Sequence, residues 1–263
     1  MPGPAARGLL LGLVLPGAGC LDDLLEAPYV LTTGIPPTAG LAPSGRGQLL
    51  AATSDGVYLV DGEGKASLLV PDEALAAGAH AQRISVLRRD RIDILTWPPG
   101  LPPAATATWP AKGAVDLQSW CDETLLVAYP DHVERLDPRT GTATTYIAGL
   151  TDVRGLSLGA KVCDAAWVAT RDGLLEVDVS GVLQRVLLAD ARAVAVDAQG
   201  HTWALHGEPR LLSALSPQGP TVIARHLGDA RDLHFGPGAL LPPENVYLAA
   251  GEGGVDYARL AMP

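Results

Sequence analysis

Short apolar runs separated by polar turns dominate the chain after its first 27 residues. Between residues 153 and 188 the apolar runs are Val153–Leu158, Ala165–Thr170, Leu174–Asp178 and Val182–Leu188. Arg171-Asp172-Gly173 separates the second run from the third, and Asp-Gly between apolar runs is typical of a β-hairpin. This stretch therefore predicts four antiparallel strands joined by tight turns.

The four-strand unit recurs about every forty residues. Its clearest marker is an Asp-x-Arg tripeptide that begins at Asp152, at Asp190 and again at Asp229, 38 and 39 residues apart. Repeats of this length made of strands are typical of a β-propeller, in which each unit forms one four-stranded blade. Six such units fill the chain from residue 27 to residue 263.

The other units follow the same plan with one irregularity. We expect strands at 48–53, 57–61 and 65–70 in the first unit, 124–129, 133–137 and 142–148 in the third, and 193–196, 201–205, 210–215 and 221–224 in the fifth. In the second unit, Arg83–Leu87 and Ile92–Trp97 are predicted as the first two strands. Two proline pairs follow them, and since proline cannot donate to a strand ladder, we expect a short or distorted outer half there.

The sixth unit predicts how the ring closes. It has strands at 232–235, 246–250 and 255–260, and then the chain stops without a fourth. A β-rich run, Pro28–Thr33, stands unassigned at the other end. If it completes the last blade, no open sheet edge is left at the seam. The predicted fold is an all-β, six-bladed propeller over residues 27–263, closed by its N-terminal strand.

The first residues are typical of an export signal. Arg7 precedes an apolar run, Gly8–Leu15, which is too short to span a bilayer. Small residues then lead into Cys20, which resembles a bacterial lipoprotein signal: residues 1–19 would be removed and Cys20 would be lipidated, with residues 20–26 as a tether. Gly17 departs from that pattern, which favours an aliphatic residue at this place. The alternative is ordinary cleavage near residues 18 and 19 and a soluble periplasmic or secreted protein.

Two cysteines remain once Cys20 is assigned to the lipid. Cys121 and Cys163 occupy the same place in adjacent units, and an even pair in an oxidising compartment suggests a disulfide. A disulfide requires Cα atoms within about 7 Å of each other. Two free thiols are the alternative.

Composition narrows the classes of partner. The chain has 263 residues, 30 of them glycine and 22 proline, and a formal net charge of −10. Because phosphate binding requires a positive field and the sequence has no run of basic residues, nucleic acid is excluded as a partner.

The strand motifs resemble those of known propellers. Gly-Leu or Ala-Val in a first strand, followed by a second strand such as Trp167–Thr170 or Tyr247–Ala250, is similar to the NHL, regucalcin/gluconolactonase-like and sensor-type propellers. The resemblance implies the fold, which hosts hydrolases, lyases, sensors and docking platforms alike. It also implies, for lactonase-like members, a divalent ion held by acidic residues and asparagine. Asn245 is the only asparagine and is expected on the opposite face, so the sequence departs from that pattern.

The repeated tripeptide supplies the candidate binding residues. Because each begins a first strand, the side chains should reach one face of the ring near the central channel; they are Asp152, Arg154, Asp190, Arg192, Asp229 and Arg231. Convergent guanidinium groups can hold a carboxylate or phosphate. The alternative is that they lock neighbouring blades by ion pairs.

The spacing of the histidines does not predict a metal site. His80, His132 and His206 are expected to share that same face, but no spacing among them indicates a metal.

These observations favour a non-catalytic, monomeric envelope lipoprotein, anchored through Cys20, whose propeller face binds an envelope protein or a small anionic ligand. No catalytic, metal or cofactor residue is assigned. The alternative is a metal-dependent hydrolase or lyase with its site in the central channel.

Overall fold

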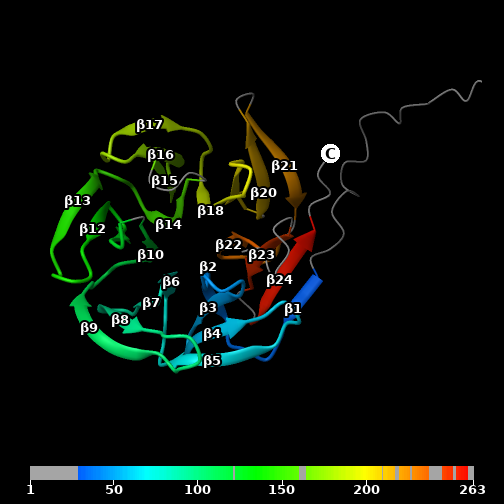
Figure 1. Ribbon diagram of the computed structural model, residues 1–263. Coiled ribbons are helices and arrows are strands. Elements are labelled where there is room, and N and C mark those ends of the chain that lie inside the picture. Colours follow the sequence, from blue (N-terminus) through cyan, green and yellow to red (C-terminus); the bar gives the residue numbers. More distant parts are fainter. Residues whose placement is uncertain are drawn as a thin grey trace, which may run out of the picture.

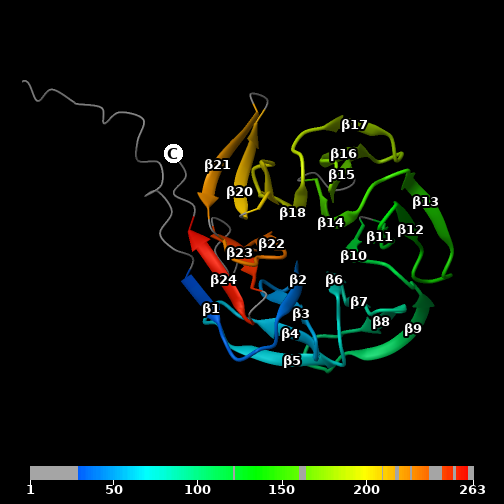
Figure 2. The same cartoon turned by 180° about the vertical axis from the view of Figure 1, so that it is seen from behind.

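Six four-stranded antiparallel sheets stand around a common axis (Figures 1 and 2). The computed structural model describes residues 29–120, 122–159, 164–208, 210–216, 219–225, 227–236, 245–250 and 253–259. Every regular element within these ranges is a β-strand, and no helix among them is long and apolar enough to cross a membrane. The predicted six-bladed, all-β propeller is confirmed.

Each blade runs from an innermost to an outermost strand. Blade 1 comprises β2 (Thr38–Pro43), β3 (Leu49–Thr53), β4 (Gly56–Val60) and β5 (Ala66–Pro71). Blade 2 comprises β6 (Ala76–His80), β7 (Arg83–Leu87), β8 (Arg91–Thr96) and β9 (Ala104–Pro110). Blade 3 comprises β10 (Asp116–Ser119), β11 (Leu125–Tyr129), β12 (His132–Leu136) and β13 (Ala143–Ala148).

The second half of the ring repeats this plan. Blade 4 comprises β14 (Val153–Leu158), β15 (Ala165–Thr170), β16 (Leu174–Asp178) and β17 (Leu183–Val186). Blade 5 comprises β18 (Ala191–Val196), β19 (Thr202–His206), β20 (Leu211–Ser216) and β21 (Gly219–Arg225). Blade 6 comprises β22 (Leu233–Phe235), β23 (Asn245–Ala249), β24 (Val255–Arg259) and, outermost, β1 (Tyr29–Thr32).

The N-terminal strand closes the ring as predicted. β1 pairs antiparallel with β24, with Tyr29 opposite Tyr257. A second tie lies nearer the axis, where the Thr38 hydroxyl donates to the Gly254 carbonyl at 2.8 Å. The N-terminal strand is therefore paired into the last blade at the rim, and a buried hydrogen bond further in joins the first blade to the last.

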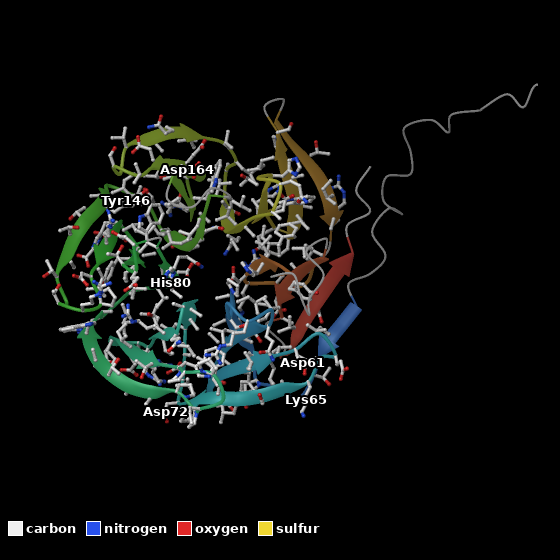
Figure 3. The ribbon with its side chains drawn as sticks, in the orientation of Figure 1. Asp61, Lys65, Asp72, His80, Tyr146 and Asp164 are labelled. Atoms are coloured by element: carbon white, nitrogen blue, oxygen red, sulfur yellow. The ribbon has the colours of Figure 1, made fainter. Side chains whose placement is uncertain are left out.

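The hydrophobic core lies between the blades and not in one central mass. Each buried cluster draws on facing sheets; in one of them Leu50 and Val57 of blade 1 pack with Ile84 and Val86 of blade 2. All five residues of β3 are buried, whereas β5 outside it is largely exposed. Lys65 and Asp72 accordingly lie at the rim, while His80 lies toward the centre (Figure 3).

The hairpin turns place glycine where a neighbouring strand comes close. Gly56 begins β4 with a φ of +154°, and a Cβ there would stand 2.3 Å from the Val70 carbonyl oxygen of β5. No other residue type fits that approach without moving the outer strand.

Blade 2 corrects the sequence prediction. Arg83–Leu87 is its second strand, β7, and the run from Ile92 falls in its third, β8, because β6 precedes both. The predicted short outer half is also wrong: β9 has seven residues and begins just after the second proline pair. The strand that was missed, Ala-Ala-Gly-Ala-His, has low intrinsic β propensity, and its conformation comes from packing between the neighbouring innermost strands β2 and β10.

Candidate functional site

The chain path gives the ring two distinct faces. The upper face carries the connections between blades and the turns between second and third strands. The lower face carries the other turns of each blade. His132 and His206 lie beside second-to-third-strand turns on the upper face, as predicted, but on separate blades. His80 ends β6 and therefore lies on the lower face, so the expectation that the three histidines share a face is wrong.

Arg154 joins blade 4 to blade 5 on the upper face. Its Nε and Nη2 donate to Asp152 Oδ2 at 2.9 and 2.7 Å, and its Nη1 donates to Asp190 Oδ1 at 2.6 Å. Both aspartates adopt a left-handed backbone, with φ of +52° and +50°, which turns the chain sharply into the following strand. The hydrogen bond from the Arg154 guanidinium is the largest cause of the lowered pKa of Asp190. This carboxylate therefore stays charged.

The same row of charge continues into blade 5 and reaches blade 6. Arg192 Nη2 donates to Glu208 at 3.1 Å, while its Nε lies 3.9 Å from Asp190 Oδ1. Arg210 donates to the same carboxylate oxygen of Glu208 at 2.6 Å and to the Ala230 carbonyl oxygen of the next connection at 3.1 Å. The Arg192 Nε is buried and has no hydrogen-bond partner in the described structure.

The third tripeptide is not built like the first. Arg231 is exposed, and within the described ranges its side chain makes no ion pair. The negative charge of Asp229 adds to burial in raising the pKa of Asp256 on β24. The three arginines thus form a row on consecutive blades, 4 to 6, from the fully paired Arg154 to the exposed Arg231.

Two aspartates at the axis were missed by the sequence analysis. Asp232 Oδ2 accepts a hydrogen bond from the Leu41 N–H at 2.7 Å, and its Oδ1 accepts one from Leu233 at 2.8 Å. Asp116 makes the same pair of bonds, to the N–H groups of Leu156 and Leu117, both at 2.7 Å. Each carboxylate therefore ties the innermost strand of its own blade to that of the next.

These two links lie on opposite sides of the ring, at the seam of blades 6 and 1 and at the seam of blades 3 and 4 (Figure 1). Facing each aspartate, the next strand carries glycine: a Cβ on Gly40 would lie 3.6 Å from Asp232 Oδ2, and one on Gly155 would lie 3.8 Å from Asp116 Oδ2. In the sequence, Gly-Leu at 40 and 155 aligns with Asp-Leu at 116 and 232, so a carboxylate in place of a small residue was the available signal.

Burial disfavours the charged forms of the two axial aspartates and of His234. Burial raises the pKa of Asp232 to about 6, and it raises that of Asp116 in the same direction, with the negative charge of Asp232 as a second cause. His234, two residues along β22, is shifted the opposite way, and burial lowers its pKa to about 4. All three side chains nevertheless keep partial contact with solvent. At neutral pH Asp232 is therefore mainly ionised, with a pKa only about one unit below the pH, whereas the His234 imidazole is neutral.

This donor set does not amount to a metal centre. In the part of the chain that the structure describes, no three His, Cys, Asp or Glu side chains are grouped as metal ligands. Each axial carboxylate already accepts two backbone hydrogen bonds. Asn245 begins β23 on the lower face, as expected from the sequence.

The remaining expectations concern residues outside the described ranges. Cys20, Cys121 and Cys163 all fall there, as does the predicted signal segment. Lipidation at Cys20 and a disulfide between Cys121 and Cys163 stay predictions.

Comparison with known proteins supports the architecture. No family model and no curated protein matches the chain. Among solved structures, it is similar to a streptogramin B lyase, with 12% identity over 90% of this chain and 97% of the other and a TM-score of 0.62.

Two further structures extend the same likeness. A gluconolactonase from Xanthomonas campestris has 14% identity, 88% coverage of both chains and a TM-score of 0.65. A putative glucose dehydrogenase from Thermus thermophilus has 16% identity, 89% coverage of this chain and 99% of the other, and a TM-score of 0.66. At these identities the likeness shows the fold alone, and it confirms the propeller resemblance drawn from the strand motifs.

Proposed function

We propose that this chain is a non-catalytic binding or assembly platform of the bacterial cell envelope, anchored through Cys20, that works through the upper face of its propeller. One observation carries the proposal. A row of guanidinium groups crosses blades 4 to 6, held in position by ion pairs at one end and left open at the other, where Arg231 is exposed.

The arginines of the row differ in exposure and therefore in their proposed roles. Arg154, 18% exposed and bonded to two carboxylates, positions the surface. Arg192, whose side chain is 29% exposed, and the open Arg231 are the groups that contact a ligand. Because ion pairs already orient Arg154 and Arg192, these side chains lose little conformational entropy when a carboxylate binds. The partner is an envelope protein that presents an acidic segment, and a small anionic ligand is the simpler form of the same chemistry.

The test is retention of the partner by purified protein in envelope extracts. The Arg192→Ala/Arg231→Ala double variant is expected to lose at least tenfold of the partner retained by the wild type, and added salt should weaken wild-type binding further. Arg89→Ala is the matched control, because Arg89 is 78% exposed on the upper face of blade 2, outside the row. Equal retention by all three proteins, or loss by the control as well, would contradict the proposal.

A second candidate is a metal-dependent hydrolase or lyase with its site at the axis. The two axial aspartates and His234 favour it, and enzymes occur among the similar folds. The described donor set falls short of three grouped ligands, so the platform is preferred. If Mg²⁺ or Ca²⁺ raised the melting temperature of the wild type but not of Asp116→Asn/Asp232→Asn, the enzyme candidate would take precedence.

A further inference from the structure

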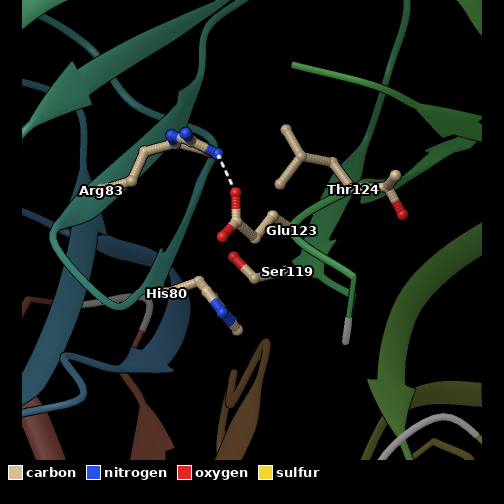
Figure 4. A pocket seen from close by; sticks show the side chains of 7 residues that line it. His80, Arg83, Ser119, Glu123 and Thr124 are labelled. Atoms are coloured by element: carbon tan, nitrogen blue, oxygen red, sulfur yellow. Dashed lines mark ion pairs between the residues drawn. The ribbon is translucent and has the colours of Figure 1, made fainter. Parts of the chain in front are cut away.

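The hollow between blades 2 and 3 on the lower face is too small to hold an organic ligand (Figure 4). Arg83 and Glu123 lie in its walls, with Arg83 Nη1 3.7 Å from Glu123 Oε2, and the enclosed space holds about one water molecule. The outer rim of blade 4 offers a larger surface to a partner.

Aliphatic side chains gather on this rim, in β17 and the residues on either side of it (Figures 1 and 2). Five large apolar side chains there are between 39% and 55% exposed: Val179, Val182, Leu183, Val186 and Leu187. Elsewhere in the described ranges the exposed large apolar side chains lie singly, on three different blades: Leu68, Leu101 and Val222. A cluster of this kind on an otherwise acidic protein indicates a contact surface.

β17 is also an open sheet edge. Among the described strands only β16 pairs with it, and Val186 stands opposite Leu175. The Leu187 N–H donates inward, to the Leu174 carbonyl oxygen at 2.9 Å. Because backbone groups alternate in direction along a strand, the N–H and C=O of Val186 point away from the blade. These groups are available to an added strand.

The outermost strands of four other blades have features that oppose such pairing. β5, β9 and β21 each contain proline, which cannot donate to a strand ladder. β13 exposes Thr144 and Thr145 in place of aliphatic residues. Residues 179–188 contain no proline, threonine or lysine. The rim of blade 4 therefore lacks the protection that these four strands have.

Area and charge distinguish the kind of partner. A fully exposed aliphatic side chain buries about 60 to 120 Å² of apolar surface, so five half-exposed ones supply about 150 to 300 Å². A stable complex of two globular proteins buries about 800 Å² on each partner. A second copy of this chain would also bring the same net charge of −10 and be repelled. The surface therefore fits one extended segment better than a second copy.

We infer that β17 is a docking edge, at which an extended, uncharged and apolar segment of a partner protein adds as a fifth strand of blade 4. The backbone of the segment bonds to the outward N–H and C=O of Val186, and its side chains cover Leu183 and Leu187. The docking edge is independent of the proposed platform surface, because it lies on the outer rim and the arginine row lies on the upper face.

The inference is tested with a synthetic peptide of alternating threonine and valine with blocked ends, which is uncharged and has high β propensity. In a titration followed by backbone amide NMR, the peptide should give saturable shifts confined to residues 174–188. The Val186 N–H should exchange with solvent more slowly when the peptide is bound. Leu183→Lys and Val186→Lys each place a charge on the edge and should weaken peptide binding at least tenfold.

Leu68→Lys is the matched control, because Leu68 is as exposed as Val186 but lies on β5 of blade 1. It should bind the peptide as the wild type does. The same peptide methylated at every backbone nitrogen keeps its side chains but has no N–H donors, so it should not bind. A thermal unfolding curve for each variant establishes that it is folded.

Four results would overturn the inference. They are failure of the unmodified peptide to bind the wild type, equal binding of the methylated peptide, equal loss of binding in folded Leu68→Lys, and occupation of the edge by something else. The last would be seen as a dimer in sedimentation velocity that Leu183→Lys dissociates, or as binding to phosphatidylcholine vesicles that Leu183→Lys abolishes.

Discussion

The axial aspartates and the upper-face arginine row both join neighbouring blades through carboxylates, but they do so in different surroundings. Asp116 and Asp232 lie at the axis, where burial raises their pKa values, and within the described residues they accept hydrogen bonds only from backbone N–H groups. Arg154 and Asp190 meet at the surface, with side chains 18% and 38% exposed. The comparison indicates that the surroundings, and not the repeat itself, decide whether a carboxylate ties two blades together through backbone N–H groups or orients a guanidinium group at the surface.

The largest expected effect is at the axis. Asp232→Ala leaves the Leu41 and Leu233 N–H groups without their acceptor, and Asp116→Ala does the same at the opposite seam. At about 1 to 3 kcal/mol for each unsatisfied group, either substitution should lower the free energy of unfolding by about 3 kcal/mol. Urea unfolding at pH 5 measures it.

Asp172→Ala is the control for this experiment. Asp172 is 66% exposed in the turn between β15 and β16, and its removal should change stability by less than about 0.5 kcal/mol. If the axial variants lost no more than this control, the axial carboxylates would not be structural links.

The pH dependence sharpens the comparison, because two axial groups act in opposite directions. The pKa of Asp232 is raised to about 6 in the folded protein, so its contribution to stability is present near pH 4 and is lost as the pH rises to 6. The pKa of His234 is lowered to about 4, so the unfolded chain binds its proton more readily and stability rises between pH 4 and 6.5. Each effect is on the order of 2 to 3 kcal/mol. The raised pKa of Asp116 adds a second contribution that falls with pH.

Single substitutions should separate the two effects. Asp232→Asn removes one falling contribution, so its free energy of unfolding should rise from pH 4 to 6.5 relative to the wild type. His234→Gln removes the rising contribution, so its stability should fall over the same interval. Urea unfolding at pH 4, 5, 6 and 6.5 gives the slopes, and slopes of the same sign in both variants would contradict this account.

Most of the fold followed from the alternation of apolar runs and turns. Blade 4 was predicted nearly residue for residue, since its strands have alternating aliphatic residues and its turn carries Asp-Gly. Blade 2 was not, because Ala76–His80 has little β propensity of its own and takes its conformation from the strands beside it. Propensity predicts strands with large side chains, whereas strands at a crowded axis are selected for small ones.

The candidate site was predicted less well, because it depends on distances between repeats. The Asp-x-Arg spacing located Arg154 and Asp190 but did not distinguish a paired Arg154 from an open Arg231. The close approach of Gly78 in one repeat to Ser119 in the next likewise lies between repeats, and no pattern within a repeat contains that contact.

The smallest expected effect is the difference in stability between variants at the two ends of the arginine row. Arg154→Ala removes bonds to Asp152 and Asp190 and should lower the free energy of unfolding by about 1 kcal/mol at roughly 0.1 M salt. At about 1 M salt the loss should shrink, because screening already weakens exposed charge pairs in the wild type. Arg231→Ala should leave stability within about 0.5 kcal/mol of the wild type at both salt concentrations, since no ion pair of Arg231 is found in the described structure. Equal losses for Arg154→Ala and Arg231→Ala at low salt would mean that the three tripeptides are equivalent supports, and a ligand would then find no open guanidinium at the end of the row.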